Sequence, residues 1–334
     1  MRETSKVTLK TLAAELGFST STVSRVLNSP EGEAHRWASP ENVRKIVAYA
    51  EEREYAPNPH AASLRTSRSG MIGVVVPRLQ DYVLAAIYEG VESAANRHGY
   101  FTVVTNTLDE PQLHEERLQR LLDRRVDGLI VANAQFENPM VDVLDMGGVP
   151  YALTNRRSPG LPSVTCDDYR GGQLVAKHLL SSGRKTFWIL GGDPRMSTSR
   201  DRVEGFLSTV SRSGCNVPTE NITYDGFDTH AGANGVVKLS NRSRFPDAIF
   251  AANDFAALGA IGVLRNRSIR VPDDIAVVGY NDTPLAEASG LTTVHSPLDE
   301  MGRDAIGLLV EIIDGRSSME ARYLAPTLMV RDTA

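Results

Sequence analysis

Four side chains near the N-terminus have the types and the spacing that base recognition in DNA requires. Thr20, Ser21, Ser24 and Arg25 lie in one stretch of helical character and share its outer side. Arginine binds guanine through two hydrogen bonds, and short hydroxyl side chains let a helix approach the base edges. The segment therefore predicts a DNA-recognition helix, with an ordinary amphipathic helical hairpin as the alternative.

The residues around this helix predict a helix-turn-helix. Gly17 supplies the left-handed turn that ends a first helix, and Ser19 caps the second. Thr8 caps the first helix and, with Asn28, is a candidate for contacts to DNA phosphates. Apolar side chains recur at helical spacing on the inner face of both helices: Leu9, Leu12, Ala13, Leu16, Val23, Val26 and Leu27.

A third helix is expected over residues 39–55, with Ser39 as its cap and Pro40 at its first position. The polar loop 29–38, which contains Trp37, connects it to the recognition helix. Residues 56–59 (Ala-Pro-Asn-Pro) interrupt regular structure, residues 60–64 have the length of one helical turn, and residues 65–70 have the composition of a linker.

A second group of polar side chains follows the ends of predicted strands. In open α/β sheets, ligands bind at the carboxyl ends of the strands, and a cluster of amides, guanidinium and carboxylate there suits a small polyhydroxylated ligand. Each residue taken alone is equally explained as a helix cap or a turn residue. The group comprises Asn155 and Arg156, Gly191 to Asp193, Arg200, Asn253 and Asp254, and Tyr280 to Asp282.

From Met71 onward, apolar runs alternate with amphipathic segments, which predicts parallel sheets covered by helices on both faces. Roughly 260 residues are many for one such sheet, so we expect two α/β subdomains. Strands are expected at 71–76, 101–105, 128–132, 150–154, 186–190, 247–251 and 275–279, and before Arg331. Helices are expected at 83–98, 111–124, 138–146, 170–182, 199–213, 229–241, 253–266 and 298–313.

Motifs for catalysis, nucleotide binding or metal binding are not found in the sequence. There is no Gly-x-Gly-x-x-Gly after the first strand, no phosphate-binding Gly-Lys-Ser/Thr and no Gly-x-Ser-x-Gly. The seven histidines are scattered, and Gly191-Gly192 is better explained as a sharp turn than as a phosphate loop. We therefore expect no enzymatic activity, no cofactor and no metal.

Charge and cysteine content agree with a DNA-binding end on a chain from a reducing compartment. The net charge is −5, but residues 1–70 hold ten Lys/Arg and eight Asp/Glu, or +2, which leaves 26 minus 33, or −7, for the remainder. So small a local charge favours a dimer, which doubles the phosphate contacts. The two cysteines, the lack of a signal sequence and the lack of a long apolar run predict a cytoplasmic protein with no membrane partner.

Over nearly its full length the chain resembles the LacI/GalR family of bacterial transcription repressors. The strongest match is 7–28, above all Thr-Val-Ser-Arg-Val-Leu-Asn at 22–28. Residues 55–58 and 61–65 resemble the family's hinge. Residues 72–74, 127–130, 252–254, 277–282 and 291–293 resemble its regulatory core, which has a type I periplasmic-binding-protein fold.

The resemblance implies roles for particular residues. Thr20 and Ser21 match the positions that choose operator bases, and Arg25 matches a base-contacting arginine; Ser19 and Asn58 complete the expected DNA-binding set. Leu64 matches the hinge leucine that wedges into the minor groove, which implies a homodimer on a near-palindromic operator. The effector-binding positions are Tyr82, Asn155, Arg156, Arg200, Phe227, Asn253 and Asn281. The Phe227 ring would face a sugar, although core packing explains it equally well.

Several positions depart from the family pattern. The loop that holds Trp37 is about five residues longer than usual, so this loop either touches DNA flanks or packs on the third helix. Thr11 stands where Asp is frequent, and Ala62 where the hinge often has Arg. Asn155 and Asn281 stand where Asp is common, which replaces carboxylates that only accept hydrogen bonds with amides that also donate.

Taken together, the sequence predicts a DNA-binding repressor controlled by a small effector, most simply a sugar. The expected organisation is a helix-turn-helix domain (1–56), a hinge and linker (57–70) and an effector-binding, dimerising core (71–334). Its two subdomains are expected at 71–165 with 296–321, and at 166–295 with 322–331. A sugar-binding transport protein and a nucleotide-dependent α/β enzyme are the alternatives.

Overall fold

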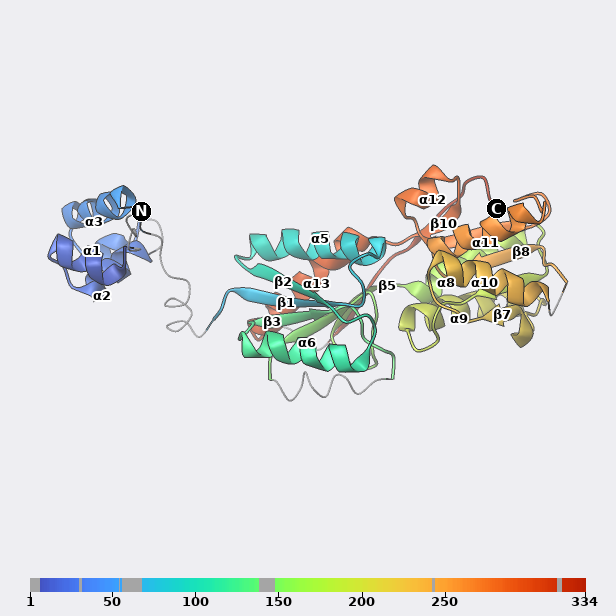
Figure 1. Ribbon diagram of the computed structural model, residues 1–334, viewed down its shortest axis with the longest axis horizontal. Helices are drawn as coiled ribbons and strands as arrows, with labels where there is room; N and C mark the ends of the chain where they lie inside the picture. Colours follow the sequence, from blue (N-terminus) through green and yellow to red (C-terminus); the bar gives the residue numbers. More distant parts are fainter. Residues whose placement is uncertain are drawn as a thin grey trace, which may run out of the picture. The chain divides into compact units, whose positions relative to one another are not determined.

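A computed structural model of the chain describes residues 7–29, 32–53, 55, 68–137, 148–241, 244–316 and 320–334. The chain divides into two compact units, Met1–Ser69 and Gly70–Ala334, which are described separately below (Figure 1). The predicted helix at 138–146 and the predicted hinge residues Asn58 and Leu64 lie outside the described residues. None of the helices in the described ranges has the length and apolar character that crossing a bilayer requires.

The N-terminal unit contains the predicted helix-turn-helix. Helices α1 (Leu9–Leu16) and α2 (Thr20–Leu27) are separated by Gly17, whose φ of 72° lies in the left-handed region. Thr8 and Ser19 cap the two helices by accepting hydrogen bonds from backbone N–H groups, as predicted. A short 3₁₀ helix, η1 (Ala34–Arg36), precedes α3 (Pro40–Glu52), which Ser39 caps. The third helix therefore ends three residues before the predicted Tyr55.

A small apolar core holds these helices together. Leu12, Val23 and Ile46 come from α1, α2 and α3 respectively, and all are fully buried. On the outside, the Glu15 carboxylate accepts hydrogen bonds from the Tyr49 hydroxyl (3.0 Å) and from Arg53 (3.2 Å), which ties α1 to α3. The recognition helix is thus mounted on a fixed three-helix frame.

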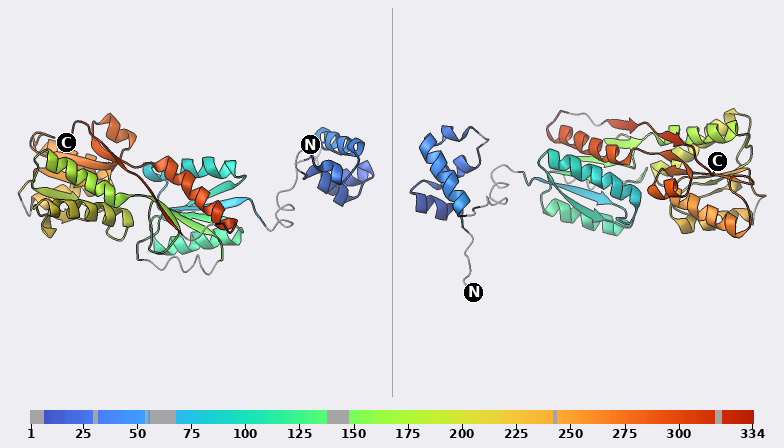
Figure 2. Two further views of the ribbon diagram at one scale, coloured as in Figure 1. Left: turned by 180° about the vertical axis from the view of Figure 1, so that it is seen from behind. Right: turned by 90° about the horizontal axis from the view of Figure 1, so that it is seen from above.

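The second unit is built on two six-stranded sheets, as the strand–helix alternation predicted. The first sheet has the order β11-β5-β4-β3-β1-β2, and its strands are parallel. Its strands are β1 (Met71–Val76), β2 (Phe101–Asn106), β3 (Gly128–Val131), β4 (Tyr151–Thr154), β5 (Ser163–Cys166) and β11 (Ala321–Leu324). Helices α5 (Tyr82–Arg97) and α13 (Leu298–Ile313) pack together on one face, and α6 (Pro111–Asp123) packs on the other (Figure 2).

The second sheet repeats this plan with the order β12-β10-β9-β8-β6-β7. Its strands are β6 (Phe187–Leu190), β7 (Ile222–Thr223), β8 (Ala248–Ala251), β9 (Ala276–Asn281), β10 (Thr292–His295) and β12 (Thr327–Met329), and β12 runs antiparallel to β10. Helices α8 (Asp168–Ser181) and α9 (Ser197–Arg212) cover one face, and α10 (Thr229–Ser240) and α11 (Asp254–Asn266) cover the other. The short η2 (Thr219–Asn221) and α12 (Pro284–Ala288) complete the unit.

Helices α8 and α9 approach each other closely because each presents a glycine to the other. A Cβ on Gly172 would lie 2.0 Å from the carbonyl oxygen of Arg202, and a Cβ on Gly205 would lie 1.9 Å from that of Tyr169. Backbone therefore meets backbone at this crossing, which fixes how α9 delivers its side chains to the end of the sheet.

The chain passes between the two sheets after β5, after β10 and after β11. The last crossing differs from the expectation: Ala321–Leu324 pairs with β5 in the first sheet, whereas residues 322–331 were expected in the second subdomain. Strands β5, β7, β10 and β11 were not expected as strands. Each is short and rich in polar residues, so its strand identity comes from pairing with neighbours in the fold.

Candidate functional site

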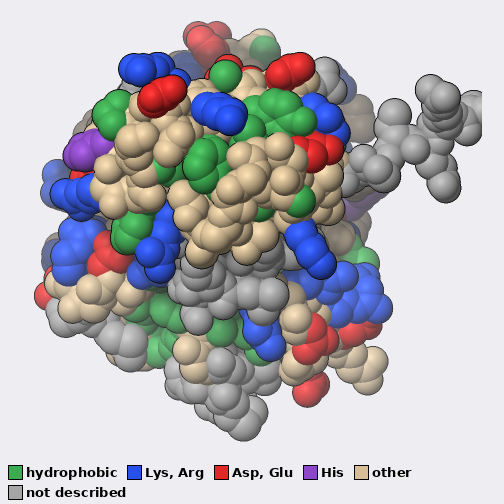
Figure 3. All heavy atoms as spheres, turned by 90° about the vertical axis from the view of Figure 1, so that its left-hand side faces the viewer, with side chains coloured by type: hydrophobic (Ala, Val, Ile, Leu, Met, Phe, Trp, Pro, Cys, Tyr) green, Lys and Arg blue, Asp and Glu red, His purple; other side chains and the backbone are tan. Residues whose placement is uncertain are grey.

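The outer face of α2 presents the predicted base-contacting residues to solvent. Thr20, Ser21 and Arg25 are exposed and Ser24 is half-buried, while Val23 and Val26 point into the core. In the space-filling view, basic and acidic side chains are interspersed rather than gathered in one basic patch (Figure 3). The structure thus brings the predicted side chains onto one face; their roles toward DNA remain predictions.

Several of the hydroxyl and amide groups expected at the DNA already hold the helix ends. The Ser19 hydroxyl accepts the Thr22 backbone N–H at 3.1 Å and lies 2.8 Å from the Ser21 hydroxyl. The Asn28 amide donates to the Ser24 carbonyl at 2.6 Å. Both residues therefore stabilise α2. Ser21 and Ser24 bond to these capping side chains, whereas the Thr20 and Arg25 side chains make no hydrogen bond to a described residue.

The Arg25 side chain contacts Trp37, the aromatic residue of the loop between α2 and α3. Its guanidinium carbon lies 4.5 Å from the centre of the Trp37 ring, which is a cation–π distance. Of the two alternatives for the loop, the structure shows packing against the third helix: Ala34 and Ala38 pack on the apolar cluster that includes Ile46 of α3, while the Trp37 side chain is not part of that cluster.

The second unit contains a cavity of about 530 Å³ between the two sheets, within the size range of small-molecule sites. It is lined by loops and helix starts that follow strand ends on both sides, as the strand-end argument predicted for the ligand site. We call it the main cavity, and its lining comprises Pro77, Arg78, Gln80, Asp81, Asp109, Arg156, Asp193, Met196, Gly226, Phe227, Asp228, Thr229 and Phe255.

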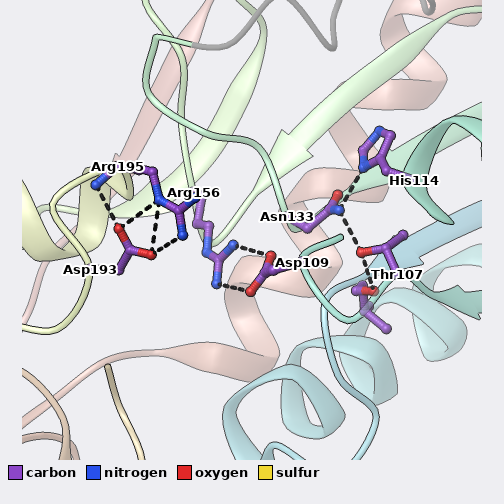
Figure 4. A network of polar contacts seen from close by, with 8 residues as sticks. Thr107, Asp109, His114, Asn133, Arg156, Asp193 and Arg195 are labelled. Carbon is purple, nitrogen blue, oxygen red and sulfur yellow. Dashed lines mark hydrogen bonds and ion pairs between the residues drawn. The ribbon is translucent and has the colours of Figure 1, made fainter. Parts of the chain in front are cut away.

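Ion pairs hold three of the six charged side chains that line the main cavity, namely Asp109, Arg156 and Asp193 (Figure 4). Arg156 donates two hydrogen bonds to the Asp109 carboxylate, at 2.9 and 3.4 Å. Asp193 pairs with Arg195 at 2.7 Å, and this side-chain hydrogen bond lowers the pKa of Asp193. Asp228 caps α10 by accepting the Ala231 backbone N–H at 2.8 Å. The exposed Arg78 forms no ion pair with any residue in the described ranges.

A smaller pocket of about 30 Å³ adjoins the main cavity and shares Asp81, Arg156 and Phe227 with it. We call it the inner pocket. It gathers three asparagines that were predicted from strand ends or from the family resemblance: Asn155, Asn253 and Asn281. The Asn253 side-chain oxygen accepts the Phe255 backbone N–H at 2.7 Å and so caps α11, which leaves its NH₂ group as the part available to a ligand.

Arg202 lines the inner pocket together with Arg156 and was not singled out from the sequence. The residue is only 3% exposed, and its guanidinium donates to Asp168 (2.7 Å), to the Ala252 carbonyl (2.7 Å) and to the Asn281 side-chain oxygen (3.3 Å). It also stacks on the Tyr280 ring at 3.8 Å. Burial disfavours the charged carboxylate and raises the pKa of Asp168, while the neighbouring Arg202 guanidinium acts in the opposite direction and favours the carboxylate.

The structure places Arg200, which was predicted to bind the effector, away from both cavities. Its guanidinium stacks on the Phe136 ring at 4.2 Å and pairs with Glu137 at 2.9 Å. The physical reason is helical geometry, because residues two apart on α9 point to nearly opposite sides. Tyr82, at the start of α5, is exposed and also lines neither cavity.

Phe136 belongs to a clasp that joins the two subdomains beside the main cavity. The Arg157 side chain forms a two-pronged ion pair with Asp201, at 2.8 and 3.0 Å, and lies 5.0 Å from the Phe136 ring centre. The Phe136 backbone N–H donates to the Arg195 carbonyl at 2.9 Å. These contacts connect loops after β3 and β4 to the start of α9 in the second subdomain.

Asp254 was also predicted from a strand end, but it lines neither the main cavity nor the inner pocket. Its carboxylate accepts the Thr283 backbone N–H (2.7 Å) and the Thr293 hydroxyl (2.5 Å) and is fully buried. Burial raises the pKa of Asp254 to about 6. The residue fixes Thr283 in the loop that directly follows Asn281 at the end of β9, so its role is to hold the site together.

Comparison with known proteins agrees with this arrangement. Residues 176–334 match the family model described as a periplasmic binding protein-like domain. The transcriptional regulator DegA of Bacillus subtilis (strain 168) is 32% identical over 334 residues, which cover 98% of this chain and 97% of DegA. The lac repressor dimer bound to operator and the anti-inducer ONPF has 25% identity and a TM-score of 0.88, with 98% of this chain and 99% of that chain covered. A complex of the transcriptional regulator CelR with cellobiose has 28% identity and a TM-score of 0.75, with 98% and 100% covered.

A helix-turn-helix joined to a two-subdomain core with a cavity between its sheets defines a ligand-controlled, DNA-binding transcriptional regulator. The similarity to DegA extends over both parts, so the class assignment rests on the whole chain. The chain belongs to the LacI/GalR family of bacterial transcriptional regulators. The relatives are regulators rather than enzymes.

Proposed function

We propose that this protein is a repressor that binds a near-palindromic operator as a homodimer and is controlled by a neutral, hydroxyl-rich effector, most simply a sugar. The observation that carries the proposal is the main cavity, which is lined from both sheets and which both subdomains must share. The operator-bound lac repressor dimer and the cellobiose-bound CelR are similar proteins whose ligands support each half of the proposal.

The charges favour a neutral ligand over a phosphate or a carboxylate. Arg156 and Arg202 are already paired with Asp109 and Asp168, so neither guanidinium needs a ligand anion. The asparagine amides of the inner pocket donate as well as accept hydrogen bonds, which matches sugar hydroxyls. Phe227 lines both cavities and offers an apolar ring face. Arg78 lines the main cavity and forms no ion pair with a described residue, so it makes a phosphorylated sugar the comparison ligand.

Effector binding is expected to shift the balance between two arrangements of the subdomains, because a ligand held by both sheets favours the arrangement in which both contact it. In the family this change reaches the DNA through the hinge. The operator affinity then changes by the ratio of the effector's affinities for the two arrangements.

The test combines DNA binding with ligand binding. Mobility shift on the DNA upstream of the chain's own coding sequence should show a sequence-specific complex whose affinity changes with one of the screened sugars, polyols or purines. No specific complex under any condition would refute the repressor assignment. In a thermal-shift screen, Phe227→Ala should abolish the response to the active ligand. Phe245→Ala, an exposed phenylalanine of the same subdomain, should retain it.

The neutral character of the effector has its own control. Each active sugar is compared with its phosphate on wild type and on Arg78→Ala. A neutral effector should bind both proteins with equal affinity. If wild type instead prefers the sugar phosphate, and Arg78→Ala loses that preference, the effector is an anion.

A further inference from the structure

Trp37 is a large apolar side chain that the fold does not use. The residue is 45% exposed, and it is not among the members of the apolar cluster that holds α1, α2 and α3 together. Its neighbours Ala34 and Ala38 do pack on that cluster. The loop is therefore anchored on both sides of Trp37, and the indole is directed outward from a fixed backbone.

Within the described residues, the ring contact of Trp37 is with Arg25, at 4.5 Å from guanidinium carbon to ring centre. Arg25 is exposed on the outer face of α2 and forms no ion pair with a described carboxylate. Its backbone carbonyl accepts the Ser29 hydroxyl at 2.6 Å, which keeps the end of α2 ordered below it. Among the described residues, the Trp37 ring is thus the side-chain contact of the Arg25 guanidinium.

We propose that Trp37 is a positioning residue for DNA recognition: it holds the Arg25 guanidinium by stacking and leaves the N–H groups along its edge free to bind a guanine. This rests on the proposed DNA-binding function. A stacked guanidinium keeps its donors in the plane of the group, where bidentate binding to a base edge takes place. An arginine that is already oriented loses less conformational entropy when it binds.

The consequence is a loss of base preference without a loss of fold or of general DNA affinity. Exposed cation–π pairs correspond to about a two- to fivefold change in an equilibrium constant. Trp37→Ala should therefore weaken binding to the preferred sequence by about that factor for each half-site. Trp37→Phe keeps a ring and should retain most of the affinity. Val47→Ala, which alters another exposed apolar side chain of this unit, is the matched control.

The experiment is binding-site selection from randomised duplex DNA with the full chain. Wild type defines the preferred sequence, and Arg25→Ala identifies the base position at which preference depends on Arg25. Trp37→Ala should lose preference at that same position and keep the wild-type salt dependence, since phosphate contacts set that slope. The melting temperature of Trp37→Ala should equal that of Val47→Ala because the ring is outside the core.

Fluorescence gives a readout that a merely structural role would not move. Trp37 and the buried Trp188 are the two tryptophans of the chain, so wild type minus Trp37→Phe isolates the Trp37 emission. Arg25→Ala should change that emission in the free protein, and the preferred duplex should not restore it.

Each outcome decides the question. If Trp37→Ala binds the preferred duplex as wild type does, or binds it more tightly because the ring obstructs Arg25, the inference is overturned. If Arg25→Ala keeps every base preference, Arg25 is not the recognition residue and the inference also fails. If wild type selects no sequence, it is the proposed function that fails.

Discussion

Removing one partner of the buried Asp168–Arg202 ion pair should cost more stability than any exposed pair in this subdomain. In Asp168→Asn, the side-chain shape and one hydrogen bond to Arg202 are kept, but the negative charge is lost. The Arg202 guanidinium would then be buried with two neutral acceptors, the Ala252 carbonyl and Asn281, and the Tyr280 ring. An uncompensated buried charge of this kind costs about 3–5 kcal/mol.

The size of the effect follows from burial. Both side chains are 4% exposed, so water cannot replace the lost carboxylate. A pair at the surface is instead exchanged for hydration at little cost. The matched control is Asp225→Asn. It removes the carboxylate of a surface ion pair in the same subdomain, the pair between Asp225 and the half-exposed Lys238.

Urea unfolding followed by Trp188 emission measures the effect, in a Trp37→Phe background that leaves one tryptophan. Trp188 is fully buried in β6 of the same subdomain and reports its unfolding. Asp168→Asn should lower the free energy of unfolding by about 3 kcal/mol or more, and Asp225→Asn should leave the midpoint near wild type. In the double variant Asp168→Asn/Arg202→Met, both charges are gone and most of the stability should return. Equal midpoints for Asp168→Asn and the control, or no recovery in the double variant, would refute the reasoning.

Two further predictions concern the packing and the titration of the core. Gly205→Ala should lower the free energy of unfolding by about 1–3 kcal/mol, because the new Cβ would lie 1.9 Å from the Tyr169 carbonyl oxygen. Gly262→Ala is the control: its Cβ would have no neighbour within 4 Å, and the variant should gain about 0.5–1 kcal/mol. Equal urea midpoints for the two variants would contradict the close helix contact. Because the folded pKa of Asp254 is raised from 3.8 to about 6, the native state keeps a proton that the unfolded chain releases. This contribution to stability, about 3 kcal/mol in total, is therefore lost as pH rises from about 3 to about 7. Asp254→Asn should remove this loss of stability. The contribution of His114 then remains, and it has the opposite sign: burial lowers the pKa of His114 to about 4, so this residue adds stability as pH rises. Parallel profiles of stability against pH for wild type and Asp254→Asn would exclude the assignment.

Local patterns predicted most of the elements because their causes are local. Capping side chains such as Thr8, Ser19 and Ser39 mark helix starts, and continuous apolar runs such as 71–76 mark buried parallel strands. Strands β5 and β10 carry hydroxyl residues in place of such runs, as in Ser163–Cys166 and Thr292–His295. Their burial results from neighbours distant in sequence, which no window of the sequence contains.

Several of the side chains predicted from strand ends do line the cavities, whereas the buried Arg202 was not singled out and Arg200, two residues away, was named in its place. Asn155, Asn253 and Asn281 follow strand ends, and the topology brings such ends together. The choice between Arg200 and Arg202 needed the phase of α9. Ser199, Arg202, Val203, Phe206 and Val210 form one buried stripe at helical spacing, and the apolar members of that stripe would have selected Arg202. The Arg25–Trp37 contact had no such signal, because it depends on the path of a loop.

Two kinds of contact connect the subdomains, and their difference in burial determines which can change. The buried group around Arg202 and Tyr280 reaches Cys166 at the end of β5, whose thiol pKa burial raises to about 12. This buried group lies where the chain crosses between the sheets. Separating its side chains would break the buried Asp168–Arg202 ion pair. The Arg157–Asp201 clasp is partly exposed and can exchange its ion pair for water at little cost. A relative movement of the subdomains is therefore expected to break the clasp and keep the buried group intact. A ligand in the main cavity then needs only a small difference in affinity between the two arrangements to shift their populations.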